Sequence, residues 1–296
     1  MNKIIEKTKI WFAISLVVIL IGVGFMMFKG LNYGIDFKGG TQITVQMNQD
    51  FVKGDVDKII DEFAAGKYSS KVINDGEELE IVIQEGVLDE TQVSSLIGKI
   101  TEKYSLEDGS YQTETIGATV GKELQNNAFL VVIVASIGML IYISIRFEFS
   151  FAMAAIIALL HDILVTLAVY AVLGIQINTP FIAAILTIVG YSINDTIVVF
   201  DRIRENRKKH LKASPAEVAN MSIKACITRS INTSITTLIT ITCLFIFVPA
   251  IRPFSLPLII GIASGAYSSI FIASPLWVIF KNAKAKKKAK ISNGVA

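Results

Sequence analysis

The chain has 296 residues, of which 52% are hydrophobic and only 18% are charged. Soluble proteins carry about 25% charged residues, so this composition favours a membrane protein. Neither cysteine, Cys226 or Cys243, lies in the polar part of the chain, which argues against a disulfide framework.

Six apolar blocks are long enough to cross ~30 Å of hydrocarbon, which takes about 20 residues per helix. They cover residues 10–28, 126–145, 149–173, 180–200, 230–250 and 256–280. The first block follows three lysines and could be a secretory signal, but it is long for one and no small-residue cleavage site follows Phe28. We therefore expect it to remain as a membrane helix.

Charge is distributed unevenly between the two sides that six spans define. Residues 29–127 carry 18 acidic and 9 basic side chains. Basic residues gather instead in residues 1–9, in the loop 201–229 and in the tail 281–296. The positive-inside rule places these three segments and both termini in the cytoplasm, and segment 29–125 outside. We interpret the lysine-rich tail as a topology anchor that touches anionic lipid, and not as a nucleic-acid site.

The exterior segment alternates strand-like and helix-like periodicity. Strands are predicted at 41–47, 70–74, 79–84 and 110–116, and amphipathic helices at 56–63 and 93–104. Asp75-Gly76 is a hairpin turn signal between the second and third strands. The order βαββαβ predicts a ferredoxin-like α/β domain. It contains no histidine or cysteine, and we see no catalytic constellation in it.

A cytoplasmic segment precedes the fifth block. Ser214-Pro215-Ala216-Glu217 has the form of a capping box with proline at the first helical position. Apolar residues follow on one face, and so we expect a short amphipathic helix along the inner membrane surface. In the sixth block, Gly261 and Gly265 stand four residues apart and predict close helix packing.

Four ionisable residues lie within spanning blocks or at their edges: His161, Asp162, Asp195 and Arg229. Charged groups at membrane depth are costly, so they normally face a protein interior or a water path. Asp195 lies among polar neighbours that include Asn194, where a carboxylate can bind and release protons. If Arg229 approaches Asp195, it would favour the charged form of that carboxylate. The alternative is that the four ionisable residues lie near the membrane interface and carry no function, and this alternative is strongest for Arg229.

Glycines mark the point where the chain leaves the first helix. Gly34, Gly39 and Gly40 flank Asp36 immediately before the first strand. Glycine permits backbone angles and close approaches that other residues resist. We predict a tight, buried junction that couples movement of the helix to the exterior domain. A plain flexible hinge is the alternative, and general physical arguments favour neither.

Three segments resemble the SecD/SecF family of Sec translocon subunits. Residues 34–40, GIDFKGG, resemble the G-I-D-F-x-G-G motif that SecD and SecF share. His161-Asp162, residues 190–206 (GYSINDTIVVFDRIREN) and Tyr267-Ser268-Ser269 resemble the SecF branch. The short exterior domain also fits that branch.

The resemblance implies a proton-driven protein of the resistance-nodulation-division superfamily in the bacterial inner membrane. It would act with SecD beside the SecYEG channel to promote late translocation of unfolded preproteins. Asp195 and Arg229 would then correspond to the family's proton-path residues, with Asn194, His161 and Asp162 as further candidates. We expect no enzymatic activity, metal or cofactor.

Two other classes remain. A proton-driven transporter of small molecules or lipids from the same superfamily would need a larger exterior domain with an apolar cavity. An intramembrane hydrolase using His161 and Asp162 would need a third partner, and neither H-E-x-x-H nor G-x-S-x-G occurs in the chain.

Overall fold

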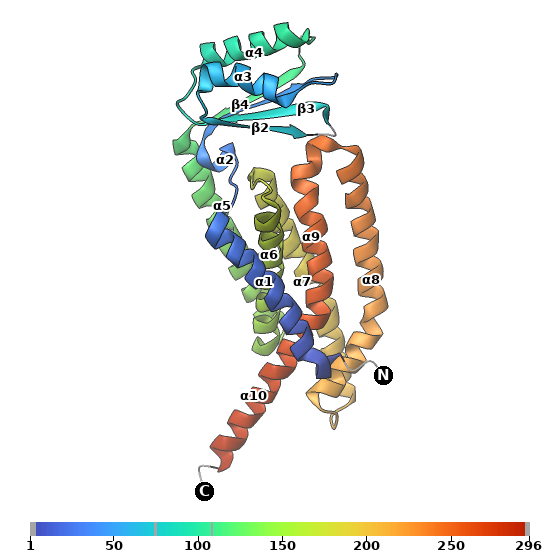
Figure 1. Cartoon of the computed structure of the whole chain (residues 1–296). Coiled ribbons are helices and arrows are strands. Elements are labelled where there is room, and N and C mark those ends of the chain that lie inside the picture. The colour runs from blue at the N-terminus through green and yellow to red at the C-terminus, as the bar shows by residue number, and fades with distance from the viewer. Residues whose placement is uncertain (1–3, 74–75, 108, 294–296) are drawn as a thin grey trace. The chain divides into compact units, whose positions relative to one another are not determined.

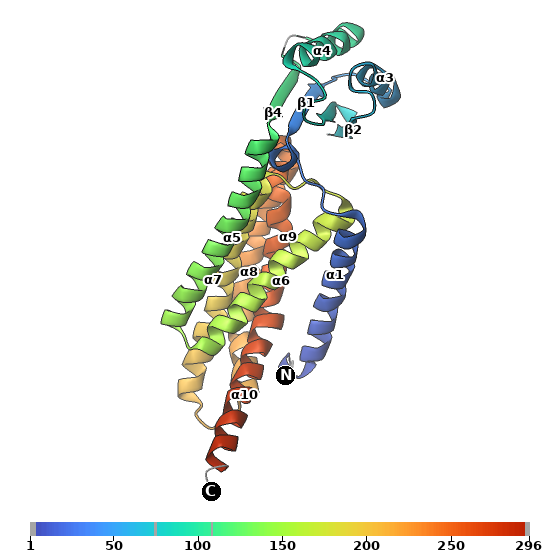
Figure 2. The same cartoon turned by 90° about the vertical axis from the view of Figure 1, so that its left-hand side faces the viewer.

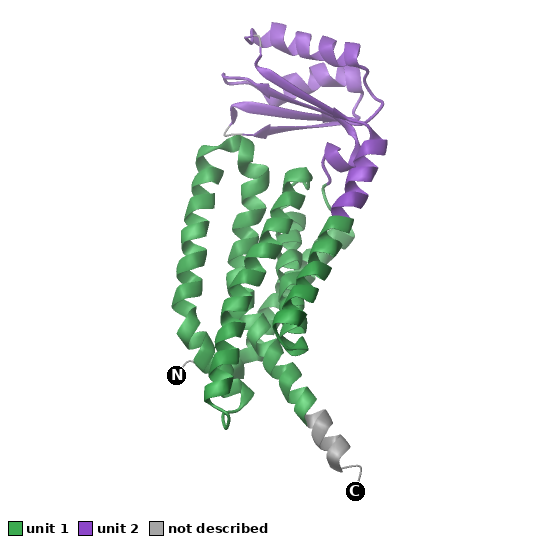
Figure 3. Cartoon of the chain, turned by 180° about the vertical axis from the view of Figure 1, so that it is seen from behind, with its two compact units in different colours: residues 1–32, 130–296 green, residues 33–129 purple. Residues whose placement is uncertain are grey.

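The protein is described by a computed structural model that covers residues 4–73, 76–107 and 109–293, with side chains as far as residue 285. The chain forms two compact units (Figure 3). Residues 1–32 and 130–296 form one unit, which we call the membrane unit. Residues 33–129 form the other, which we call the exterior unit after its predicted side.

Six helical segments of the described chain are long and apolar enough to span a membrane, as predicted. The first five are α1 (Thr8–Lys29), α5 (Ala118–Arg146), α6 (Phe149–Leu173), α7 (Thr179–Lys209) and α8 (Pro215–Phe247). A short 3-10 turn, η1 (Ile5–Lys7), precedes α1. The sixth span is composite and consists of η3 (Pro249–Ile251), α9 (Arg252–Ser268), the π-helical turn η4 (Ser269–Ala273) and α10 (Ser274–Asn293).

The separate amphipathic helix predicted before the fifth block is wrong. The capping box is present, because Ser214 and Glu217 exchange side-chain and backbone hydrogen bonds. From this cap, however, α8 runs without a break for 33 residues to Phe247. No glycine or proline interrupts it after Pro215, so nothing in the local sequence ends the helix at the membrane surface.

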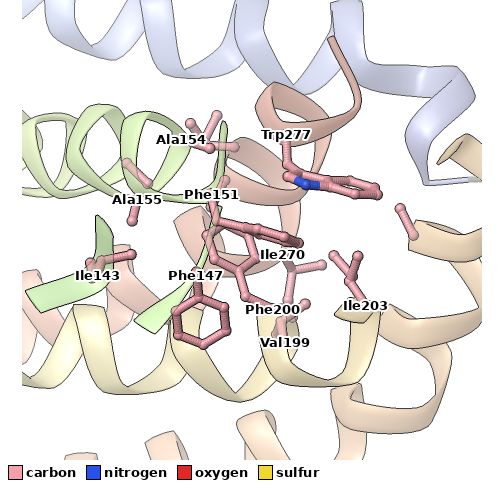
Figure 4. Packing of buried hydrophobic residues seen from close by; sticks show 14 of the residues in the cluster. Ile143, Phe147, Phe151, Ala154, Ala155, Val199, Phe200, Ile203, Ile270 and Trp277 are labelled. Carbon is pink, nitrogen blue, oxygen red and sulfur yellow. The ribbon is translucent and has the colours of Figure 1, made fainter. Parts of the chain in front are cut away.

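The membrane unit has a core in which α6, α7 and α10 meet (Figure 4). The ring of Phe151 lies 4.8 Å from that of Phe200 and 5.1 Å from that of Trp277. On α9, a Cβ at Gly261 would overlap Ile188 of α7, which confirms the close packing predicted from its small residues. The helix α1 packs along α6 (Figures 1 and 2).

The exterior unit has the predicted βαββαβ order. Its elements are α2 (Ile35–Lys38), β1 (Gly40–Gln46), α3 (Lys53–Ala64), β2 (Tyr68–Ile73), β3 (Glu78–Ile83), α4 (Glu90–Tyr104) and β4 (Tyr111–Ile116). The strands form one antiparallel sheet in the order β2-β3-β1-β4. Asn74 and Asp75, at the predicted strand end and turn, lie outside the described residues; Ile73 pairs with Glu78 across the hairpin.

Both α3 and α4 cover one face of the sheet (Figure 1). Ile43, Val45 and Met47 point to this side and are at most 1% exposed, because alternate residues of a strand face the same way. The helices bury Val56 and Ile60 of α3 and the apolar stripe of α4 against them. The periodicities of the sequence therefore assigned the core of this unit correctly.

Candidate functional site

Two carboxylates are buried in the membrane unit. Asp162 of α6 is fully buried, and Asp195 of α7 is 7% exposed. A buried carboxylate is stable only when hydrogen bonds or opposite charges replace the water it has lost. The partners of each therefore show what each site can do.

Asp162 accepts four hydrogen bonds within the protein. Ser264 and His161 donate to its Oδ1 from 2.7 and 3.0 Å, while Ser192 and Ser268 donate to its Oδ2 from 2.6 and 2.7 Å. The three serines come from α7 and α9, so the carboxylate holds these two helices to α6. Charge-assisted bonds of this kind are roughly twice as strong as neutral ones.

His161 continues the network from Asp162 to α1. Its Nε2 lies 2.9 Å from the hydroxyl of Ser15, and that hydroxyl lies 3.5 Å from the Tyr267 oxygen. The Tyr267 hydroxyl in turn donates to the Trp11 carbonyl at 2.9 Å. The His161 and Tyr267 rings are stacked, with their centroids 6.0 Å apart. The network thus joins α6, α9 and α1.

Asp195 has a sparser environment. Ser269 donates to its Oδ2 at 2.9 Å. Two contacts set the register between α7 and the neighbouring α8: Tyr191 donates to the Thr233 carbonyl, and Cys226 lies 4.0 Å from the Val198 carbonyl. By interpolation between them, Arg229 of α8 lies at the level of Asp195, and Ser230 is one residue further along α8.

Ser230 and Ser234, one turn apart on α8, are both buried, and among the described residues neither hydroxyl has a hydrogen-bond partner. Buried polar groups normally find a partner, which is often water. Two buried hydroxyls on α8 without a partner in the described part of the chain are therefore suited to bind water.

Consecutive residues of the sixth span bind the two carboxylates. Ser268 donates to Asp162 and Ser269 donates to Asp195, at the point where α9 changes to the π-helical turn η4. Single π-helical turns occur frequently at functional sites. Sequence reasoning identified this pair only as part of the family resemblance. The available signal was two adjacent hydroxyls in the middle of an apolar span.

The contact between Arg229 and Asp195 stays a prediction. The two described side chains form neither a hydrogen bond nor an ion pair, and Arg229 is exposed. Asn194 is exposed as well. Both residues neighbour a buried residue in sequence, Ser230 and Asp195 respectively, and the 100° step of a helix turns them away from the interior.

The glycines after α1 form a packed junction. Gly34, Gly39 and Gly40 are buried, and Asp36 is half-buried. A Cβ at Gly39 would lie 2.8 Å from the Ala118 nitrogen, and one at Gly40 would overlap the Ile83 carbonyl.

The junction is completed at the start of α5. The Glu85 carboxylate accepts from the Ala118 N–H at 2.6 Å, which caps α5. Backbone atoms of Phe37 and Gly39 lie 3.1 Å from a Cβ built on Gly121. Such distances require glycine, and so the geometry favours the tight junction over the flexible hinge.

Ion pairs connect the helix ends where basic residues gather. Glu148, between α5 and α6, lies 2.6 Å from Lys281 of α10 and 3.3 Å from Arg207 of α7. The hydrogen bond from Lys281 lowers the pKa of Glu148 below its ordinary value, with help from the nearby charges and against partial burial. Glu148 therefore stays ionised and ties three helices together.

Comparisons with known proteins agree on one family. The family described as "Protein export membrane protein SecD/SecF, C-terminal" matches residues 96–283, and "SecD/SecF GG Motif" matches residues 24–50. Protein translocase subunit SecF of Sebaldella termitidis is 39% identical, with 97% of this chain and 94% of that protein covered.

Longer relatives contain the same region. Protein translocase subunit SecDF of Bacillus subtilis is 38% identical over 95% of this chain, which matches 38% of that protein. The crystal structure of SecDF from Thermus thermophilus, described as a translocon-associated membrane protein, superposes with a TM-score of 0.86. It is 33% identical, and the match covers 95% of this chain and 39% of that one.

Proposed function

Since the chain belongs to the SecD/SecF family of protein export membrane proteins, we propose that it is the SecF-type auxiliary subunit of the Sec translocase. It uses the proton motive force to promote late translocation of preproteins. The single observation that carries the proton-driven part is the pair of buried carboxylates joined through Ser268 and Ser269.

SecD is the proposed partner in the membrane. In the SecDF relatives the region similar to this chain is 38–39% of a longer protein, which supports pairing with a SecD-like part. The described helix α5 has an almost entirely exposed apolar surface, with Phe129, Val134 and Ile141 each more than half exposed. Such a surface needs lipid or another helix against it.

The proposed orientation places the exterior unit outside the cytoplasm and both termini inside. The acidic balance of residues 29–127 and the basic segments around the other helix ends support it. The lysine-rich tail then lies against anionic lipid at the cytoplasmic surface. SecYEG and the emerging preprotein complete the proposed assembly.

The preprotein contact of the exterior unit is assigned to a groove of about 930 Å³ between α4 and β4. Val93 and Ile97 line one wall, and Tyr111 and Thr113 line the other. This mixture of apolar and hydroxyl groups suits an extended polypeptide, which offers both side chains and backbone donors. A photo-cross-linker at Thr113 should capture an arrested preprotein, while one at Glu62, on the exposed side of α3, should not.

Asp195→Asn tests the proton-driven function, because asparagine keeps the shape of the carboxylate but does not titrate. The variant should lose the part of preprotein export that depends on the proton gradient, while still co-purifying with SecD. Arg229→Lys keeps the charge without the planar guanidinium group, so a partial defect would show that geometry matters at this exposed position. Export at the wild-type rate, with an unchanged response to collapse of the gradient, would refute the proposal.

A further inference from the structure

We propose that His161 is a second proton-binding residue of the membrane unit, and that its charge state is transmitted to α1 by the hydroxyl of Ser15. The inference deepens the proton-driven function proposed above and rests on it for its role in export. It is carried by the hydrogen bonds around Asp162, which leave one position in the network where a proton can be added.

Asp162 is already saturated as an acceptor. Each of its oxygens accepts two hydrogen bonds, and all four partners are donors from the protein. A proton on Oδ1 would leave Ser264 or His161 without its acceptor, and a proton on Oδ2 would require Ser268 to turn to the Gly265 carbonyl, 3.3 Å away. Leaving a buried donor unpaired costs about 1–3 kcal/mol. The donors Ser192, Ser264, Ser268 and His161 therefore leave Asp162 no free acceptor position for a further proton.

His161 can take a proton without losing a partner. With a neutral ring, Nδ1–H donates to Asp162, and Nε2 accepts from Ser15 at 2.9 Å. A proton added to the Nε2 lone pair makes that nitrogen a donor to the same serine oxygen. The step breaks no covalent bond. It converts a single buried negative charge into a neutral ion pair, which a medium of low dielectric constant favours.

No other titratable group near His161 and Asp162 is placed to take up this proton. The nearest titratable side chains on the packed helices are Tyr267 of α9, Asp195 of α7, which is bound by Ser269, and Tyr191 of α7, which donates to the Thr233 carbonyl. Residues 10–28 of α1 contain none, and neither does η4. His161 is thus the nearest group to Asp162 that can change its charge.

Proton uptake forces the Ser15 hydroxyl to turn. Once Nε2 of His161 donates to the Ser15 oxygen, the Ser15 hydroxyl hydrogen needs a new acceptor. The Tyr267 oxygen lies 3.5 Å from the Ser15 oxygen. The Tyr267 hydrogen is already directed at the Trp11 carbonyl, so the tyrosine oxygen can accept. Good O–H···O bonds measure about 2.7–2.8 Å, so the new bond forms fully only when α1 and α9 approach each other.

The shape of α1 allows such a movement at one end. Gly22 packs so closely on Ala168 of α6 that a Cβ there would overlap it, which fixes the later half of the helix. Ser15 lies about two turns earlier, where α1 contacts the sixth span through Trp11, which packs on Phe271 and accepts a hydrogen bond from Tyr267. The early half of α1 can therefore shift toward α9 about the contact between Gly22 and Ala168 when His161 is charged.

The test uses the full chain in lipid nanodiscs and two intrinsic probes. His210, the other histidine, is exposed at the end of α7, and His210→Gln leaves His161 as the single imidazole signal in a nitrogen NMR spectrum. Trp277→Phe leaves Trp11, whose ring lies 4.3 Å from Phe271, as the single tryptophan. Its fluorescence then reports on movement of α1.

Between about pH 8 and pH 5, where histidine ordinarily changes its charge, Nε2 should gain a proton and Trp11 emission should shift with the same midpoint. The emission shift should be absent in His161→Gln and reduced in Ser15→Ala. The matched control Ser255→Ala, a buried serine of α9 that bonds only within its helix, should retain it. An Nε2 that stays unprotonated throughout, or an emission shift that persists in His161→Gln, would overturn the proposal.

Neither measurement requires translocation. If His161 fails to titrate while Asp195→Asn still abolishes proton-dependent export, only this inference is lost. If His161 titrates and moves α1 while Asp195→Asn exports normally, the second site stands and the proposed role of Asp195 fails.

Discussion

Gly39→Ala should loosen the first strand of the exterior unit far more than an equivalent change elsewhere. Gly39 has φ of +76°, in the left-handed region, and its added Cβ would meet the Ala118 nitrogen at 2.8 Å and its Cα at 2.9 Å. Both atoms belong to the backbone of α5 and cannot rotate away as a flexible side chain could.

The size of the effect follows from two contributions. An L-residue in the left-handed region costs about 1–2 kcal/mol, and forcing an extra methyl group into a packed site typically costs about 1–3 kcal/mol. Together they come to about 2–5 kcal/mol. Because about 1.4 kcal/mol is a factor of ten in an equilibrium constant, local opening should increase on the order of 30- to 3,000-fold.

Gly66 provides the matched control. It also has φ of +76°, but a Cβ there would meet no atom within 4 Å. Gly66→Ala should therefore carry only the backbone contribution of about 1–2 kcal/mol. The difference between the two variants isolates the packing of the junction.

Hydrogen–deuterium exchange of the β1 amides, residues 41–46, in the full-length protein measures this opening directly. A packing contribution of about 1–3 kcal/mol predicts exchange about 5- to 140-fold faster in Gly39→Ala than in Gly66→Ala. If the two variants exchange at the same rate, the junction tolerates a side chain. The glycines would then act as a hinge, and the reasoning from Ala118 would be refuted.

Three further predictions test the fold and its orientation. A cysteine at Glu77 should react with an impermeant thiol reagent on spheroplasts and one at Lys208 only after lysis; reversed labelling would contradict the proposed topology. Gly261→Ala should destabilise the membrane unit by about 1–3 kcal/mol because its Cβ overlaps Ile188. Gly190→Ala should not destabilise it, because a Cβ at Gly190 would meet no atom within 4 Å. Equal melting temperatures for the two variants would refute the packing argument. Glu148→Gln should lose about 1 kcal/mol or less at neutral pH, since its ion pairs are partly exposed. The lowered pKa of Glu148 means that the wild-type advantage is complete above about pH 4.5 and disappears as the pH falls through the folded value. An advantage that does not shrink at any acidic pH would exclude the Glu148 carboxylate as its source.

The sequence by itself determined the elements of this protein and their inward faces. Six apolar blocks gave six spans, and alternation at Ile43, Val45 and Met47 identified the core side of β1. These features are local, because hydropathy and periodicity depend on residues only a few positions apart. Local sequence could not show that the helix after Ser214 continues into the fifth span. Its polar start and apolar continuation fit one long helix as well as two helices.

Only the tertiary structure decided which polar residues meet. The sequence pointed first to Asp195 and Arg229, whereas the most extensively bonded carboxylate is Asp162. Its three serine donors lie 30, 102 and 106 residues away in sequence. A serine in an apolar helix has the same local signal whether it bonds its own backbone or a distant carboxylate. Helical periodicity states which residues share a face, but the neighbour of that face, and the outward turn of Arg229, depend on how whole helices pack.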